Sequence, residues 1–98
     1  MYLYLDDIRQ PKHNNFYIVR NYEDCIHILK NNTVYFLSLD HDLGEEKTGY
    51  DIAKFIVENE INIRQINIHS ANPVGRDNIK QLIKHYFPDT IVTFDKDL

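Results

Sequence analysis

The sequence is short of the residues that build disulfides, linkers and membrane spans. Its 98 residues include one cysteine, Cys25, three glycines, three prolines and no tryptophan. One cysteine can form neither a disulfide within the chain nor a multi-cysteine zinc site. No apolar run is long enough to cross a bilayer, and none follows a basic start as in a signal peptide. We therefore expect a single cytosolic domain over residues 1–98, without a membrane partner and without linkers or repeats.

Positive charge is also scarce. The chain has 11 Lys and Arg against 15 Asp and Glu, for a formal net charge of -4. This balance disfavours binding to duplex nucleic acid or to an anionic membrane, although a local basic or metal-bearing pocket could still bind phosphate. The hydrophobic fraction of 43% is ordinary for a folded protein, so we expect a small domain with one core.

Apolar runs alternate with helical spacings along the chain. The pattern predicts strands over residues 1–5, 16–20, 34–39, 65–69 and 90–94. Three helices are predicted between the last four strands; Asn21 and Thr48 would cap the first two, and the third covers about 74–86. This order indicates an α/β fold of three layers, with helices on the faces of a five-stranded, mostly parallel sheet. The first connection has no helical pattern, which leaves an antiparallel first pair of strands as the competing topology.

The stretch Ser38-Leu39-Asp40-His41-Asp42-Leu43-Gly44 follows the most apolar of the predicted strands. It places two carboxylates and an imidazole where a buried strand ends, and no packing need explains that choice. Ligands of an open parallel sheet bind outside the carboxyl ends of its strands, so the stretch is typical of a site. Further polar side chains follow the other strands: Asp6, Asp7, Arg9, His69, Ser70, Asn72, Arg76, Asp95 and Lys96. If the first and third strands are adjacent, most of these side chains meet in one crevice.

The predicted site suits phosphate chemistry with a divalent cation. Clustered carboxylates are tolerated when a cation lies among them or when one of them is protonated. Oxygen ligands favour Mg²⁺ or Mn²⁺, and a nearby imidazole makes Zn²⁺ a further candidate. The candidate metal ligands are Asp6, Asp7, Asp40 and Asp42, and the candidate phosphate-binding residues are Arg9, Ser70, Asn72 and Arg76. The candidate catalytic residues are Asp40, His41, His69, Arg9 and Arg76, with the two histidines as acid and base.

Most of these residues also have an explanation that involves no function. A single Asp after a strand, such as Asp6 or Asp7, is a common turn or cap residue. His69 could be a hydrogen-bonded histidine at a strand end, and Arg76 could be an exposed residue in the first turn of its helix. Ser70 and Asn72 are both favoured in turns and caps. The functional prediction therefore depends on the residues as a set.

Four motifs resemble those of the cyclic-phosphate-processing receiver-like domains, a derived form of the response-regulator receiver domain. They are Leu-Asp-Asp-Ile-Arg-x-Pro at 5–11, Ser-Leu-Asp-His-Asp-Leu-Gly at 38–44, Gly-Tyr-Asp at 49–51 and His-Ser-Ala-Asn-Pro-x-Gly-x-x-Asn at 69–78. The resemblance implies a flavodoxin-like sheet and processing of a cyclic phosphate. It also implies that the polar residues of these motifs lie on or beside the pocket of the family.

Three functions are compatible with this set of residues. The first is metal-assisted opening of a cyclic phosphate, for which a 2′,3′-cyclic nucleotide or an RNA end is the expected partner. The second follows from the parent receiver domains, in which Asp40 would accept a phosphoryl group. Ser70 and Lys96 would then match the hydroxyl and the lysine of that chemistry, although the chain lacks a helix after the first strand and a final helix. The third is a noncatalytic nucleotide-binding module. The oligomeric state is left open.

Overall fold

The computed structural model describes residues 1–98. Five strands alternate with three helices along the chain, as predicted. The strands are β1 (Tyr2–Leu5), β2 (Phe16–Val19), β3 (Phe36–Leu39), β4 (Gln65–Ile68) and β5 (Ile91–Thr93). The helices are α1 (Tyr22–Asn31), α2 (Gly49–Glu58) and α3 (Pro73–Tyr86). The strands are slightly shorter than predicted, because apolar residues continue beyond the hydrogen-bonded segments.

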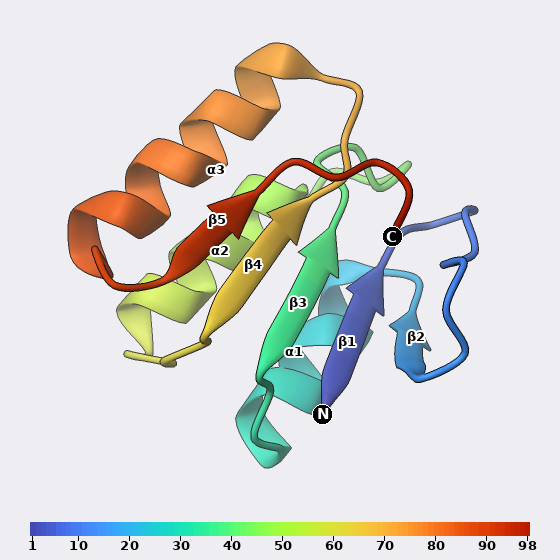
Figure 1. Cartoon of the computed structure of the whole chain (residues 1–98), viewed down its shortest axis with the longest axis horizontal. Coiled ribbons are helices and arrows are strands. Elements are labelled where there is room, and N and C mark those ends of the chain that lie inside the picture. The colour runs from blue at the N-terminus through green and yellow to red at the C-terminus, as the bar shows by residue number, and fades with distance from the viewer.

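The five strands form one sheet in the order β2-β1-β3-β4-β5, with every neighbouring pair parallel (Figure 1). The first two strands are therefore parallel, which settles the topology that the sequence left open. Residues 6–15 connect them without a helix. The strand order changes direction between β1 and β3, the place where an open parallel sheet binds its ligands.

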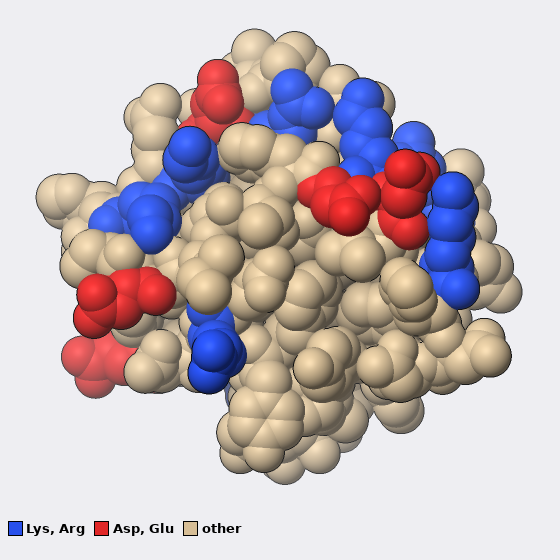
Figure 2. All heavy atoms as spheres, viewed as in Figure 1, with Lys and Arg blue, Asp and Glu red and all other residues tan.

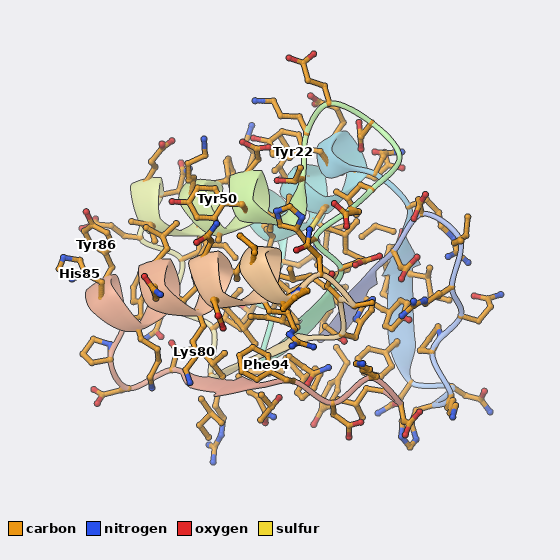
Figure 3. All side chains as sticks on the ribbon, turned by 90° about the horizontal axis from the view of Figure 1, so that it is seen from above. Tyr22, Tyr50, Lys80, His85, Tyr86 and Phe94 are labelled. Carbon is orange, nitrogen blue, oxygen red and sulfur yellow. The ribbon has the colours of Figure 1, made fainter.

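All three helices cover one face of the sheet, as the views from the front and from above show (Figure 1, Figure 3). Each helix lies in a connection that advances across the sheet in the same direction, from β2 towards β5. Right-handed crossovers that advance in one direction place their helices on one face. The connection from β1 to β2 runs the other way and has no helix, and residues 94–98 form none either. The five parallel strands and three helices match the prediction, but the fold has two layers in place of the expected three.

The core lies between the sheet and the helices. Alternate strand residues point towards the helices, and in β1, β3 and β4 these are leucines and isoleucines. Leu3, Leu5, Leu37, Leu39, Ile66 and Ile68 are all buried, with exposures of 1% or less. Ile52, Ile56, Ile79 and Ile83 face them from α2 and α3. One continuous apolar cluster therefore holds the helices on the sheet.

The opposite face, which we call the helix-free face, carries the other strand residues. In register across the sheet they form one row of Phe16, Tyr2, Phe36, Gln65 and Ile91. A second row consists of Ile18, Tyr4, Ser38, Asn67 and Thr93. Figure 2 shows this face, with charged side chains gathered near its rim. The second row leads directly to the carboxyl ends of the strands.

Each helix begins at a residue that caps it. Asn21 accepts a hydrogen bond from the backbone N–H of Asp24, and Thr48 forms a reciprocal capping box with Asp51. Asn72 accepts from the backbone N–H of Gly75 at the start of α3. The predicted caps at Asn21 and Thr48 are confirmed. None of the three helices combines the length and apolar character needed to cross a membrane.

The central strand offers a test of the core. Leu37→Ala removes a side chain with 0% exposure, so it should lower the free energy of unfolding by about 2–5 kcal/mol, measured by urea denaturation. The control is Val74→Ala, because Val74 is 68% exposed in α3 and its truncation should change stability by about 0.5 kcal/mol at most. Equal losses in the two variants would contradict this description of the core.

Candidate functional site

The carboxyl ends of β1, β3 and β4 bring three ionisable side chains together. Asp6, Asp40 and His69 are each the first residue after their strand, and their potential metal-ligand atoms all lie within 4.8 Å of one another. They come from segments far apart in sequence, and only the parallel pairing of β1, β3 and β4 makes them neighbours. We call these three residues the carboxylate–histidine cluster. The first and third strands are therefore adjacent, and three of the side chains predicted to meet at the strand ends do so.

Asp6 is a fully buried carboxylate with its oxygens hydrogen-bonded. Its Oδ1 accepts from the backbone N–H groups of Ile8 and Arg9 at 3.0 and 2.9 Å. Its Oδ2 lies 3.0 Å from Nε2 of His69. Burial by itself would raise the pKa of Asp6, but the two N–H groups and the His69 ring outweigh it and hold the pKa below its ordinary value. Asp6 is therefore a carboxylate at neutral pH.

His69 is also fully buried, and both of its ring nitrogens are engaged. Nε2 faces Asp6, and Nδ1 lies 2.8 Å from Oγ of Ser38. The ring of Tyr4 stacks on the imidazole, with centroids 4.6 Å apart and planes 3° apart. Burial lowers the pKa of His69 below its ordinary value, against the opposing effect of Asp6. The ring is therefore neutral at physiological pH.

Asp40 is the half-buried carboxylate of the cluster. Its Oδ1 accepts from the backbone N–H of His41 at 2.8 Å. Burial raises the pKa of Asp40 above its ordinary value, and the negative charge of Asp6 adds to this effect. Hydrogen bonds from the Ser70 hydroxyl and the His41 N–H oppose the rise only in part. A cation beside Asp40 would remove this electrostatic penalty.

His41 lies beside the cluster and is oriented by its neighbour in sequence. Nδ1 of His41 is 3.0 Å from Oδ1 of Asp42, and 17% of the His41 side chain is exposed. A carboxylate only accepts hydrogen bonds, so Nδ1 donates to Asp42, and Nε2 has no hydrogen-bond partner. The amide of Asn72 approaches both residues at 3.5 Å. His41 therefore has the free nitrogen that an acid or base requires.

The three glycines of the chain all border the site. A Cβ atom at Gly49 would lie 2.2 Å from the carbonyl oxygen of Asp40, and one at Gly75 would lie 2.5 Å from the His41 ring. Gly44 has a positive φ of 68°, and its Cβ would lie 2.8 Å from Oδ2 of Asp7. Glycine at these places lets the loop after β3 and the start of α3 approach the functional side chains closely.

Guanidinium groups flank the cluster. Nη1 of Arg9 donates to the carbonyl of His69 at 3.3 Å, and Nη1 of Arg76 donates to the carbonyl of Ser70 at 3.4 Å. Arg76 also lies over the ring of Phe94, 5.5 Å from its centroid. Nη1 of Arg20 donates to the carbonyls of Asp6 and Arg9, which holds the loop after β1 in place. Two guanidinium groups are thus placed beside the end of β4.

The remaining predicted residues lie around the cluster and outside it. Asp7 packs against Gly44, and the exposed Asp42 pairs with His41, so neither carboxylate joins Asp6 and Asp40. The buried Ser70 hydroxyl accepts from the backbone N–H of Asn72 and bonds Asp40. Asn72 is the cap of α3, and Lys96 is exposed. Their predicted roles as ligands of metal or phosphate stay predictions.

Sequence reasoning assigned no role to four residues that shape the site. They are Tyr4, Arg20, Ser38 and Asn67. The available signal was a small or amide side chain inside an otherwise apolar strand, as Ser38 is in β3 and Asn67 is in β4. Both are fully buried, and a buried polar group is kept only when it has partners.

The largest hollow of the structure lies elsewhere. It has a volume of about 380 Å³ and is lined by residues of α2 and α3, among them Tyr50, His85 and Tyr86 (Figure 3). It contains no carboxylate and no arginine. Chemistry therefore favours the polar cluster at the strand ends over this hollow as the site.

Two of the three residues of the cluster offer ligands that suit a divalent cation. Asp6 and Asp40 present carboxylate oxygens from two adjacent strands, which suits Mg²⁺ or Mn²⁺. Burial, together with the negative charge of Asp6, raises the pKa of Asp40, and no side-chain cation forms an ion pair with this carboxylate. His69 already bonds Asp6, so it fits as the group that orients a ligand rather than as a ligand.

The electrostatic penalty at Asp40 predicts an unusual effect on stability. The folded protein holds the Asp40 proton more tightly than the unfolded chain, so the charged carboxylate lowers stability at neutral pH, and this loss disappears as the pH falls. Asp40→Asn should therefore raise the free energy of unfolding at pH 7 by about 0.5–2 kcal/mol in thermal or urea denaturation.

Asp51 is the matched control for this variant. Burial would raise its pKa, but the Thr48 N–H and Lys54 outweigh this and lower the pKa, so the charged form stabilises the fold above the unfolded-state pKa. This stability is lost as the pH falls through the lowered pKa. Asp51→Asn should therefore destabilise the protein by about 0.5–1 kcal/mol. A loss of stability in Asp40→Asn would contradict the account of the cluster.

Comparison with known proteins assigns the chain to a family. The family model described as cyclic-phosphate processing receiver domain matches residues 1–85. This match runs from β1 through almost all of α3 and confirms the resemblance in the motifs. No curated protein and no solved structure matches the chain. The chain therefore belongs to the family of cyclic-phosphate processing receiver domains.

Proposed function

We propose that this domain opens a cyclic phosphate with the help of a divalent cation, held by Asp6 and Asp40. The observation that carries the proposal is the carboxylate–histidine cluster with arginines on its flanks. Two carboxylates from adjacent strands lie within 4.8 Å of each other, and Arg9 and Arg76 are bonded only weakly, at 3.3 and 3.4 Å, to backbone carbonyls. Such guanidinium groups can turn to phosphate oxygens at little loss.

The reaction is hydrolysis of one ester bond of the ring. Water forms a bond to phosphorus, the bond from phosphorus to one ring oxygen breaks, and that oxygen takes up a proton to give a phosphomonoester. The free Nε2 of His41 suits it to take a proton from water or deliver one to the leaving oxygen. Arg9 and Arg76 would stabilise the charge that develops on the phosphate. The cation would supply further charge neutralisation when bound.

The hydrogen bonds of His41 and His69 distinguish the roles first predicted for these two histidines. His41 has one nitrogen on Asp42 and one free, whereas His69 has both nitrogens engaged. We therefore assign proton transfer to His41 and orientation of Asp6 to His69. The proposed substrate class is a cyclic nucleotide or an RNA end with a 2′,3′-cyclic phosphate. A small phosphate ligand fits a polar site at strand ends. The cytosolic location of the protein stays a prediction.

The second candidate function is phosphoryl transfer to Asp40, as in receiver domains. One feature favours it, because Ser70 lies at the end of the neighbouring strand and its side chain acts to lower the pKa of Asp40. The weak point is Lys96, which is exposed and forms no ion pair with Asp40. Acetyl phosphate or beryllofluoride would modify Asp40 in this case, and Asp40→Asn would abolish the change in mass or spectrum.

The main test is turnover of a panel of cyclic phosphates with Mg²⁺, Mn²⁺ or Zn²⁺. We expect a phosphomonoester product from the wild type and losses of about 10²-fold or more in Asp40→Asn and His41→Ala. His85→Ala is the control, because His85 is exposed near the end of α3 and away from the cluster. Asp40→Asn is expected to fold well, so a loss of turnover in this variant would report on the chemistry and not on unfolding.

Three other results would decide against this proposal. No turnover by the wild type across the panel and the metals would overturn it, and tight binding without product would identify a noncatalytic binding module. Turnover that is unchanged in Asp40→Asn would place the chemistry outside the cluster.

A further inference from the structure

We propose that Asn67 and Ser38 form a hydrogen-bonded relay of fixed direction that holds His69 as a donor to Asp6. In this state Nε2 of His69 carries the proton, and neither ring nitrogen offers a lone pair to a metal or a substrate. Asn67 and Ser38 are thus positioning residues that act through His69. The consequence for catalysis rests on the proposed function, but the protonated nitrogen is a property of the protein alone.

The direction of the relay is set by the backbone of Asp95. Its N–H donates to Oδ1 of Asn67 at 2.8 Å, and its carbonyl accepts from Nδ2 of Asn67 at 2.8 Å. A backbone N–H only donates and a carbonyl only accepts, so the orientation of the Asn67 amide is fixed. The Thr93 hydroxyl, which donates to Oδ1 at 2.7 Å, agrees with this orientation.

The same logic carries the direction from Asn67 to Asp6. Nδ2 of Asn67 donates its second hydrogen to Oγ of Ser38 at 3.1 Å. The hydroxyl hydrogen of Ser38 is then free to bond Nδ1 of His69 at 2.8 Å, which makes Nδ1 an acceptor. The Asp6 carboxylate only accepts, so the ring hydrogen lies on Nε2 and is donated to Oδ2 of Asp6 at 3.0 Å, which leaves Nδ1 to accept from Ser38.

Burial and packing prevent the relay from reversing. Asp6, Ser38, Asn67 and His69 all have 0% exposure, so water cannot replace any partner. Ser38 lies between Tyr4 and Asn67 in one row of the sheet, and its small side chain leaves room for the imidazole. The Tyr4 ring lies parallel to the imidazole and restricts its rotation. Both the place and the tautomer of His69 are therefore set before any ligand binds.

The relay gives a function to a segment beyond the family match. The match ends at residue 85, whereas the direction of the relay begins at Asp95. At the end of the relay, Oδ2 of Asp6 accepts one hydrogen bond from His69, and Asp6 and Asp40 place ligand atoms within 4.8 Å of each other. Groups that orient a metal-ligating carboxylate typically change metal affinity or activity by about 10–100-fold when they are removed.

The test is the ¹⁵N spectrum of the His69 ring in the metal-free protein at neutral pH. We expect Nε2 to resonate as a protonated nitrogen and Nδ1 as an unprotonated one. Addition of Mg²⁺ alone should leave the Nε2 proton in place. A proton on Nδ1 in the wild type, or loss of the Nε2 proton with Mg²⁺, would overturn the proposal.

Two variants test the direction of the relay. Asn67→Asp replaces the donor to Ser38 with an acceptor, so the hydroxyl should turn round and Nδ1 of His69 should gain a proton. Thr93→Val is the matched control. It removes the hydroxyl that donates to the Asn67 amide, but the Asp95 backbone still fixes the orientation of that amide. The His69 spectrum should therefore keep the wild-type pattern. An unprotonated Nδ1 in Asn67→Asp would contradict the relay, and the wild-type spectrum decides alone if that variant does not fold.

Activity separates this inference from the proposed function. We expect turnover of a cyclic phosphate to fall about 10–100-fold in Asn67→Asp. A wild-type protein with the proton on Nε2 but no turnover would support the relay and overturn the proposed function. Turnover by a protein with the proton on Nδ1 would support the proposed function and overturn the relay.

Discussion

The hydrogen bond between Asp6 and His69 is the interaction on which the rest of the site depends. It joins the ends of β1 and β4 across the end of β3, between two side chains that are both fully buried. Removal of one partner from such a pair typically costs about 1–3 kcal/mol or more, because the buried group that remains loses its hydrogen bond. The turn after β1 forms around Oδ1, the other oxygen of Asp6. The Tyr4 ring stacks on the imidazole of His69, and the Ser38 hydroxyl bonds its Nδ1.

The one-sided architecture explains why the sheet can accommodate this pair. The helices cover one face with a continuous apolar core, so the stability of the fold comes from that side. The helix-free face can therefore carry the second row of strand residues, in which Ser38 and Asn67 lead to the cluster. The same region includes a carboxylate, Asp40, that lowers stability in its charged form. Functional sites commonly retain such destabilising groups because the activity needs them.

Much of the fold and part of the site could be predicted from the sequence. The spacing of apolar residues located all eight elements, and the caps at Asn21 and Thr48 followed from local chemistry. Asp6, Asp40 and His69 were identified because each directly follows an apolar strand. Sequence could not separate Asp6 from Asp7 or Asp40 from Asp42, because the course of the turns after β1 and β3 decides which carboxylate reaches the cluster. The roles of Ser38 and Asn67 depend on register, and the two-layer arrangement depends on strand order.

We propose that Asp6 and Asp40 together hold a divalent cation beside a phosphate. The most direct measurement is a crystal structure of the protein with Mn²⁺ and inorganic phosphate, in which the anomalous signal locates the metal. We expect one strong peak between the carboxylates of Asp6 and Asp40, with phosphate oxygens near Arg9 or Arg76 and the imidazole of His69 still bonded to Asp6. A metal bound at Asp42 and the exposed loop, or no metal at the cluster, would contradict it.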